Sequence, residues 1–138
     1  MLEPAERAAI ERLERRWLDC ELEGRPADVL ELCSDDVVWL PPGRPPIRGK
    51  DAVRAWLVPS RDHIQDISLT HVVVHGDGLG AHKVANFRTR YVPAGSADAV
   101  TIEGWHLWVL RRDAGSSWQV QAVTWSLVEP STRPEAGS

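Results

Sequence analysis

The chain of 138 residues is long enough to bury a sizeable hydrophobic core and fits within one domain. Its formal net charge of −4 gives no electrostatic reason to expect nucleic acid or an anionic membrane as a partner. No apolar run approaches the ~20 residues of a membrane span. The N-terminus lacks the apolar core of a signal peptide, so we expect a cytoplasmic protein.

Aromatic residues are used unevenly, with seven tryptophans against one tyrosine and one phenylalanine. Because tryptophan is bulky and its buried indole N–H needs a partner, some of the seven belong to the core. A cluster of them would also suit a pocket for a flat, apolar ligand. The two cysteines, Cys20 and Cys33, are expected to be reduced and buried, with a disulfide or redox pair as the alternative.

The beginning of the chain has helical periodicity. Between Pro4 and Glu23, apolar residues recur at three- and four-residue spacing, which predicts a helix with one buried face. Gly24 ends this helix, and Pro26 suits the first turn of a second, short helix that runs to about Cys33. The predicted buried face consists of Ile10, Leu13, Trp17 and Cys20.

The segment from Ser34 to Leu57 is the most informative part of the chain. Val37–Trp39 predicts a strand, which the four prolines that follow must end. Gly49 opens a third helix with an apolar face, and Pro59 closes it. The apolar side chains of this segment suit the wall of a cavity, and the segment supplies no reactive groups.

From about Ile64 the hydrophobic period changes to two, which predicts strands joined by short hairpin turns. Helices followed by such a meander predict an α+β fold, with three N-terminal helices packed on a strongly curved, mostly antiparallel sheet. We expect a single domain over residues 1–129 and a polar, disordered tail over 130–138. The predicted strands are roughly Ile67–His75, Ala81–Val92, Val100–Arg112 and Trp118–Val128.

Two segments carry a family resemblance: DDVVWLPPGRPPIRGKDAVRAW, which begins at Asp35, and EGWHLWVLRRDAGSSWQVQAVTWS, which begins at Glu103. With them the chain, from Ile10 to Ser126, resembles the nuclear transport factor 2-like superfamily. Within it, the resemblance is to the SnoaL-like polyketide-cyclase and kinase-association-domain branch. The resemblance implies a cone-shaped fold around a pocket. It is weak for activity, because the superfamily hosts isomerases, cyclases, epoxide hydrolases, dehydratases and non-catalytic binders.

One member of that superfamily is informative by contrast. Ketosteroid isomerases of this fold use a Tyr on the first helix and an Asp at the end of the first strand. The alignment places Trp17 and Pro41 at these positions, and neither side chain can do that chemistry. The third group of that site falls near His106. The resemblance therefore does not imply the isomerase mechanism for this chain.

Hairpin registers sort the strand residues into two faces, and a one-residue slip would exchange them. The expected pairs are His75 with His82, Val72 with Ala85, Ala85 with His106 and His106 with Ala122. The expected inner face comprises Val72, Ala85, His106 and Ala122, with Gly104, Thr124, Phe87, Trp108 and Val120 as neighbours. The expected outer face comprises His82, Asn86, Arg88, Arg90, Trp105, Leu107 and Trp125.

In this register His106 is the readily titratable side chain near the middle of the concave face, so it is the candidate catalytic acid or base. A structural histidine and a purely ligand-binding one are the alternatives. Small neighbours around it leave volume for a ligand. The candidate ligand-binding residues are Trp17, Trp39, Trp56, Lys83, Phe87, Trp108 and Thr124.

No metal or cofactor site is expected. His71 and His75 would be roughly 13 Å apart on a strand, too far for one ion, and His75 with His82 lacks a third ligand. The sequence therefore predicts a pocket protein for a small apolar molecule. If it is an enzyme, it isomerises, cyclises or hydrates that molecule without a cofactor.

The alternative is a non-catalytic dimerisation or partner-binding module of the same fold. The expected outer face is unusually apolar for a monomer. Together with the family resemblance, this face predicts a homodimer.

Overall fold

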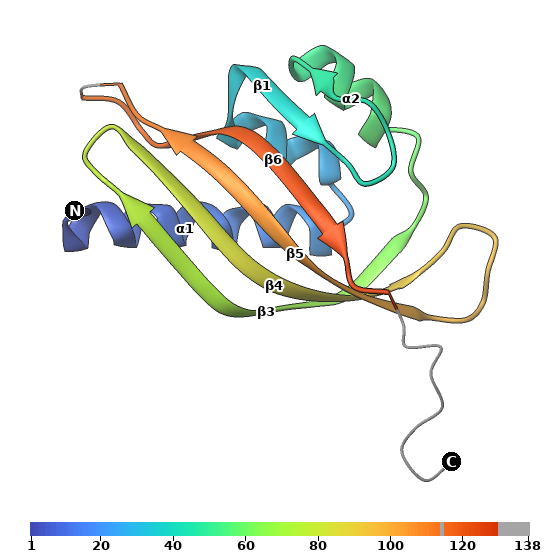
Figure 1. Cartoon of the computed structure of the whole chain (residues 1–138). Helices are drawn as coiled ribbons and strands as arrows, with labels where there is room; N and C mark the ends of the chain where they lie inside the picture. Colours follow the sequence, from blue (N-terminus) through green and yellow to red (C-terminus); the bar gives the residue numbers. More distant parts are fainter. Residues whose placement is uncertain (114, 130–138) are drawn as a thin grey trace, which may run out of the picture.

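The computed structural model describes residues 1–113 and 115–129. Figure 1 shows the helices gathered on one side of a curved sheet, with α1 behind the strands in this view. The expected tail over 130–138 lies outside the described residues. In chain order the elements are α1 (Pro4–Leu22), the 3₁₀ helix η1 (Pro26–Leu32), β1 (Cys33–Leu40), β2 (Ile47–Arg48), α2 (Lys50–Leu57), β3 (His63–Gly76), β4 (Gly80–Val92), β5 (Val100–Arg111) and β6 (Gln119–Leu127).

The helix predictions are confirmed to within a residue or two. The buried side chains of α1 are the four of its predicted face. Gly49 has a φ of 86°, a left-handed conformation that suits glycine, and α2 begins directly after it. Cys20 and Cys33 are free and buried, as expected. Burial is the main cause that raises the pKa of the Cys33 thiol to about 12, so this cysteine is an inert core group.

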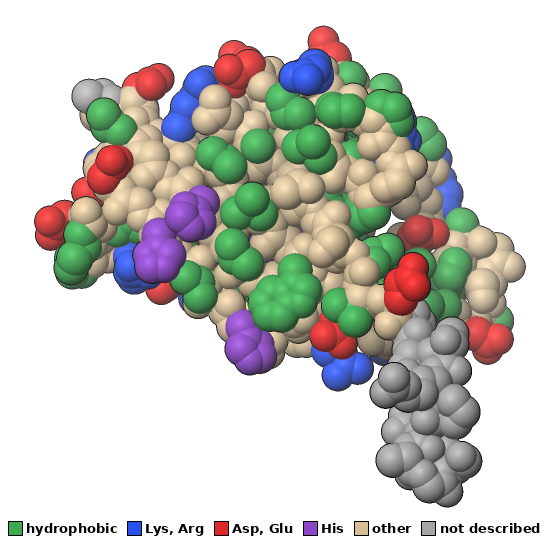
Figure 2. All heavy atoms as spheres, in the orientation of Figure 1, with side chains coloured by type: hydrophobic (Ala, Val, Ile, Leu, Met, Phe, Trp, Pro, Cys, Tyr) green, Lys and Arg blue, Asp and Glu red, His purple; other side chains and the backbone are tan. Residues whose placement is uncertain are grey.

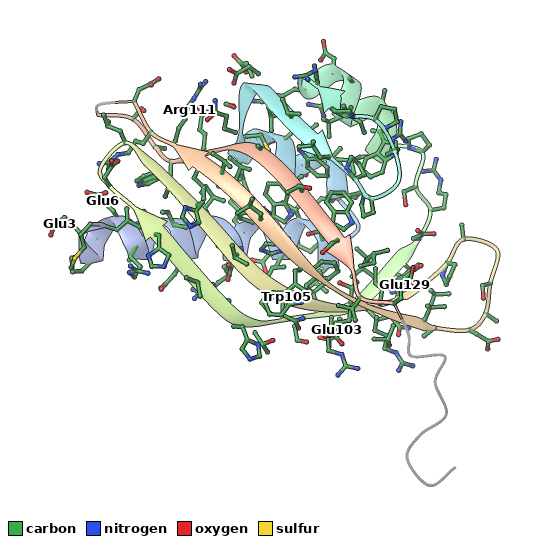
Figure 3. The ribbon with its side chains drawn as sticks, viewed as in Figure 1. Glu3, Glu6, Glu103, Trp105, Arg111 and Glu129 are labelled. Atoms are coloured by element: carbon green, nitrogen blue, oxygen red, sulfur yellow. The ribbon has the colours of Figure 1, made fainter. Side chains whose placement is uncertain are left out.

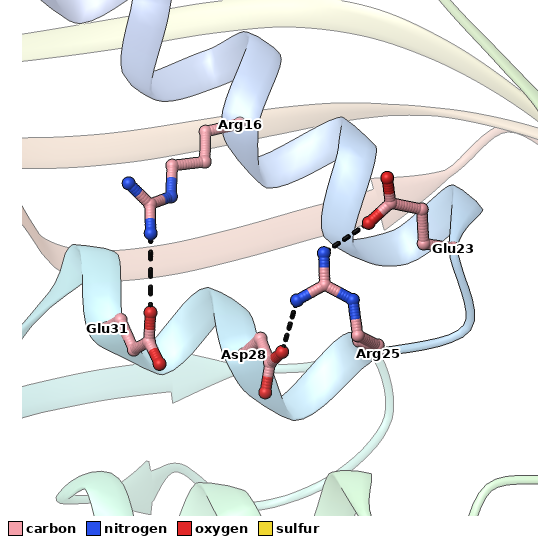
Figure 4. Close-up of polar contacts among 5 residues, drawn as sticks. All are labelled: Arg16, Glu23, Arg25, Asp28 and Glu31. Carbon is pink, nitrogen blue, oxygen red and sulfur yellow. Dashed lines mark hydrogen bonds and ion pairs between the residues drawn. The ribbon is translucent and has the colours of Figure 1, made fainter.

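Exposed ion pairs join α1 to η1. Arg16 of α1 contacts Glu31 of η1 at 3.5 Å, and Arg25 in the connecting turn contacts both Glu23 and Asp28 (Figure 4). Exposed pairs of this kind contribute little to stability. Packing of the apolar faces therefore holds the helices against the sheet.

The six strands form one sheet in the order β2-β1-β6-β5-β4-β3. Only the β1–β6 pairing is parallel, and all the others are antiparallel. This arrangement confirms the α+β prediction of helices on a curved, mostly antiparallel sheet. The two-residue strand β2 was not predicted; it follows the proline-rich turn and pairs Ile47 with Trp39.

The predicted register is correct in the middle of the sheet and wrong at two places. His75 pairs with His82 and Ala85 with His106, as expected. A bulge between Thr70 and Val73 leaves Val72 without the expected partner, and its side chain is 44% exposed and outside the pocket lining. The extra residue of a β-bulge breaks the two-residue alternation that the prediction assumed.

The second error lies in β6. His106 pairs with Trp125 and not with Ala122, because the β5–β6 register shifts between Val109 and Leu110. Directly opposite residues share a face, so Trp125 joins His106 on the concave side. Thr124 pairs with Leu107 and lies on the convex side. The expected faces of Thr124, Trp125 and Ala122 are therefore exchanged.

The convex face of the sheet is apolar. Trp105 is 41% exposed there, and Val73, which pairs with Val84, is similarly exposed. Figure 2 shows hydrophobic side chains and histidines gathered on the face that the sheet turns to the viewer, and Figure 3 labels Trp105 beside Glu103 on β5. The homodimer through this face stays a prediction. None of the helices in the described part of the chain combines the length and apolarity that crossing a membrane requires.

Candidate functional site

A pocket of about 410 Å³ lies between the concave face of the sheet and the helices. Residues of both α-helices, of η1 and of every strand except β2 contribute to its lining. Its wall is rich in aromatic side chains, because five of the seven tryptophans are in it. They are Trp17, Trp39, Trp56, Trp108 and Trp125.

The tryptophans pack against one another and leave the cavity open. The ring of Trp17 is 5.7 Å from that of Trp39 and 4.5 Å from that of Trp108, measured between centroids. Trp39 meets the rings of Trp56 and Trp125 edge-on, at 6.2 and 6.0 Å. Aromatic pairs at these separations stabilise each other beyond their buried area. The cluster is therefore a rigid wall and does not plug the cone.

The structure places five of the seven candidate ligand-binding residues in this lining: the four tryptophans and Phe87. Thr124 is not among the lining residues, and its hydroxyl donates to the carbonyl oxygen of Leu40 at 3.2 Å. Trp125 takes its place, which sequence reasoning missed because the β6 register was wrong. Lys83 is also absent from the lining.

Lys83 points inward from β4 but lies beneath the pocket wall. Its side chain is 0% exposed, and its ammonium forms an ion pair with Glu14 of α1. The same ammonium lies 3.7 Å from the centroid of the Trp108 ring, a cation–π contact. Burial lowers the pKa of Lys83, and the Glu14 carboxylate opposes that shift. The structure thus gives Lys83 a partner within the protein.

His106 lies in the pocket wall between two aromatic rings. Its imidazole stacks on Phe87 at 6.2 Å and on Trp108 at 5.2 Å. Its Nε2 is buried and has no hydrogen-bond partner among the described residues. Burial, with a smaller contribution from the charge of Lys83, lowers the pKa of His106 to about 3. The imidazole is therefore a neutral part of the pocket wall near pH 7.

The pKa of His106 predicts a pH dependence of stability. Between its usual value of 6.5 and the folded value of about 3, the unfolded chain binds a proton that the folded chain does not. The free energy of unfolding should then fall as the pH drops through this window. The His106→Phe variant keeps the stacked ring and should show a shallower fall in urea unfolding at a series of pH values. A slope equal to that of the wild type would show that His106 protonates freely in the folded protein.

Glu21 is a functional candidate that sequence reasoning missed. It lines the pocket from α1, one helical turn beyond Trp17. Burial raises the pKa of its carboxyl to about 7, and a hydrogen bond with Trp17 and the charge of Lys83 oppose the shift. The sequence does show that one helix face carries Glu14, Trp17, Leu18 and Glu21 at three- and four-residue spacing. The sequence did not show that this face lines a cavity.

Within residues 1–113 and 115–129, no group of three or more His, Cys, Asp or Glu side chains could hold a metal ion. The polar side chains of the lining that can exchange hydrogen bonds with a ligand include Glu21, Thr89 and Tyr91. Activity without a cofactor stays a prediction.

Comparison with known proteins gives one family and many structures of the same fold. The model of the SnoaL-like domain family matches residues 15–118, well over half of the chain. A ketosteroid isomerase-like protein from Erwinia carotovora atroseptica is 22% identical, with 93% of this chain and 100% of that chain covered and a TM-score of 0.76. No curated protein matches the chain.

Two structures from Novosphingobium aromaticivorans are similar as well. A candidate aromatic ring hydroxylase is 23% identical, with 94% of both chains covered and a TM-score of 0.81. A candidate scytalone dehydratase is 12% identical, with 91% of this chain and 85% of that chain covered and a TM-score of 0.78. At these identities the likeness shows the fold and no particular activity.

Proposed function

This chain belongs to the SnoaL-like domain family, and from that premise we propose that it binds a small apolar metabolite in the pocket between α1 and the sheet. The observation that carries the proposal is the cavity of about 410 Å³, whose lining combines a wall of tryptophans with a few polar side chains, among them His106 and Glu21. Pockets of this size, largely apolar and with few polar groups, are typical of small-molecule sites.

The polar groups have different roles in this proposal. His106, whose pKa is near 3, stays neutral in the wall with its Nε2 buried, and its ring adds aromatic surface against which the ligand packs. This differs from the general acid or base that the sequence suggested, because burial removes its ionisation near neutral pH. Any isomerisation, cyclisation or hydration without a cofactor would need a group that ionises near pH 7. Among the shifted pocket groups, the carboxyl of Glu21 meets that need.

The names of two similar structures, a ketosteroid isomerase-like protein and a candidate scytalone dehydratase, are consistent with such proton chemistry. The likeness to them shows the fold alone and assigns neither a reaction nor a substrate to this chain. Binding is therefore the part of the proposal to test first.

Filling part of the cavity should weaken binding. Thr89 lines the pocket, and its neighbour Arg90 is exposed and hydrogen-bonds to Gln65. A panel of small apolar metabolites should contain compounds that raise the melting temperature of the wild type. Thr89→Phe should weaken their binding by about tenfold or more, a loss of about 1.4 kcal/mol in binding free energy. Isothermal titration calorimetry would measure it.

Arg90→Phe adds similar bulk outside the pocket and is the matched control, so it should bind like the wild type. Equal loss in both variants would place binding outside the pocket. A wild type that binds none of the panel would favour the alternative, a non-catalytic partner-binding module.

A further inference from the structure

The charged side chains in the pocket lining are all acidic, and the ammonium of Lys83 behind the wall is already paired with Glu14. Three carboxyl side chains line it, from Glu14, Glu21 and Asp62, and no lysine or arginine of the described residues does. The histidine in the wall is neutral near pH 7. A ligand with a carboxylate or phosphate would therefore enter without a positive partner. An anion in so apolar a site would lose its hydration and gain little in return.

Two of the three carboxyls already have partners within the protein. Glu14 forms an ion pair with the buried ammonium of Lys83. Asp62 is exposed at the pocket mouth and accepts a hydrogen bond from the backbone N–H of Ala94 at 2.9 Å. Glu21 accepts a hydrogen bond from Trp17, and Lys83 acts on it only through its charge. Glu21 is thus the pocket carboxyl that is neither exposed to solvent nor held in an ion pair by the described residues.

The tryptophan wall is suited to a cation. Indole rings attract positive charge over their faces more strongly than other aromatic rings do. Two tryptophans of the wall already carry such contacts from the protein itself: Lys83 lies over Trp108 at 3.7 Å, and Arg44 lies over Trp56 at 5.5 Å. The ring of Trp17, next to Glu21, lines the pocket as well. A carboxylate beside indole faces is a favourable site for a protonated nitrogen.

We propose that the ligand of this pocket is an arylalkylamine, a flat aromatic ring system with its amine on an alkyl carbon, whose protonated nitrogen pairs with Glu21 while its ring system packs against the tryptophan wall. The inference rests on the proposed binding function of the pocket and adds the charge of the ligand to it. The nitrogen supplies the counter-charge that Glu21 lacks, and the flat body replaces water against Trp17 and Trp39.

A matched series of probes tests the charge directly. Naphthylmethylamine, naphthylmethanol and naphthoate share one ring system and differ in being cationic, neutral and anionic, and the corresponding anthracenyl compounds cover a larger ligand. Their affinities for the full chain are measured by isothermal titration calorimetry at about pH 8, where a carboxyl with a pKa of about 7 is ionised. The amine should bind about tenfold or more tightly than the alcohol, and naphthoate should bind most weakly.

Glu21→Gln should reduce the preference for the amine to about twofold or less while leaving the affinity for the alcohol unchanged. Glu11 is exposed on the same helix and outside the pocket, so Glu11→Gln removes an equal charge as the matched control and should keep the preference. Equal affinity for amine and alcohol, tighter binding of naphthoate, or a preference that survives in Glu21→Gln would overturn the inference and leave the proposed binding function standing. If no compound of either ring size binds, the proposed function fails with it.

Discussion

Replacing Lys83 by methionine should lower the free energy of unfolding by about 3 kcal/mol. Methionine has a similar length, so the change removes the charge with little change of volume. The Lys83 side chain is 0% exposed, and Glu14 is 19% exposed. Without the ammonium, the Glu14 carboxylate is left in a largely buried site with no positive partner. The cation–π contact with Trp108 is lost as well. Urea unfolding near pH 7 measures the change.

The double variant Lys83→Met/Glu14→Gln should recover much of this loss, because no unpaired charge then stays in the interior. The exposed pair of Arg16 and Glu31 provides the comparison, and Glu31→Gln should cost less than about 0.5 kcal/mol. If Lys83→Met is as stable as the wild type, the buried ion pair does not stabilise the fold and the account of Lys83 is wrong.

Gly104→Ala should destabilise the protein by about 2–3 kcal/mol, a large effect for a single added methyl group. A Cβ at Gly104 would lie 2.1 Å from the backbone oxygen of Ser126 and 2.6 Å from the ring of Phe87. The backbone oxygen belongs to the neighbouring strand β6 and cannot move without disturbing the pairing. Thermal and urea unfolding both measure the loss.

Gly80→Ala is the matched control for this substitution. Gly80 also lies in the sheet, but a Cβ there would have no atom within 4 Å. It should therefore change the free energy of unfolding by less than about 0.5 kcal/mol. A Phe87→Ala/Gly104→Ala double variant should not recover stability, since the contact with the Ser126 oxygen remains. Equal stability of the Gly104→Ala and Gly80→Ala variants would contradict the close packing of β5 against β6.

Gly104 also shows that small residues in a strand can mark either a cavity or close packing. Small residues beside His106 were expected to leave volume for a ligand. At Gly104 the structure shows the opposite use, because the ring of Phe87 occupies the space that a side chain would take. The cavity that does form owes its volume to the separation between α1 and the sheet, which no strand residue reveals by itself.

The sequence alone determined the helices, the strand meander and the family. Each of these depends on local periodicity, turn residues or a motif, and such signals can be identified from residues that are close together in the sequence. The pairing of Ala85 with His106 was also predictable, because the turn between β4 and β5 keeps an unbroken register. This predicted pairing correctly placed His106 in the pocket wall.

The tertiary structure alone decided the wall and the charges of the site. The bulge between Val109 and Leu110 reverses the alternation of β6, so Trp125 and not Thr124 faces the pocket. The pKa values of His106 and Glu21 depend on groups from α1, β4 and β5 that meet only after folding. Burial is a property of the assembled surroundings, so one buried histidine becomes neutral and one helix carboxyl becomes titratable near pH 7.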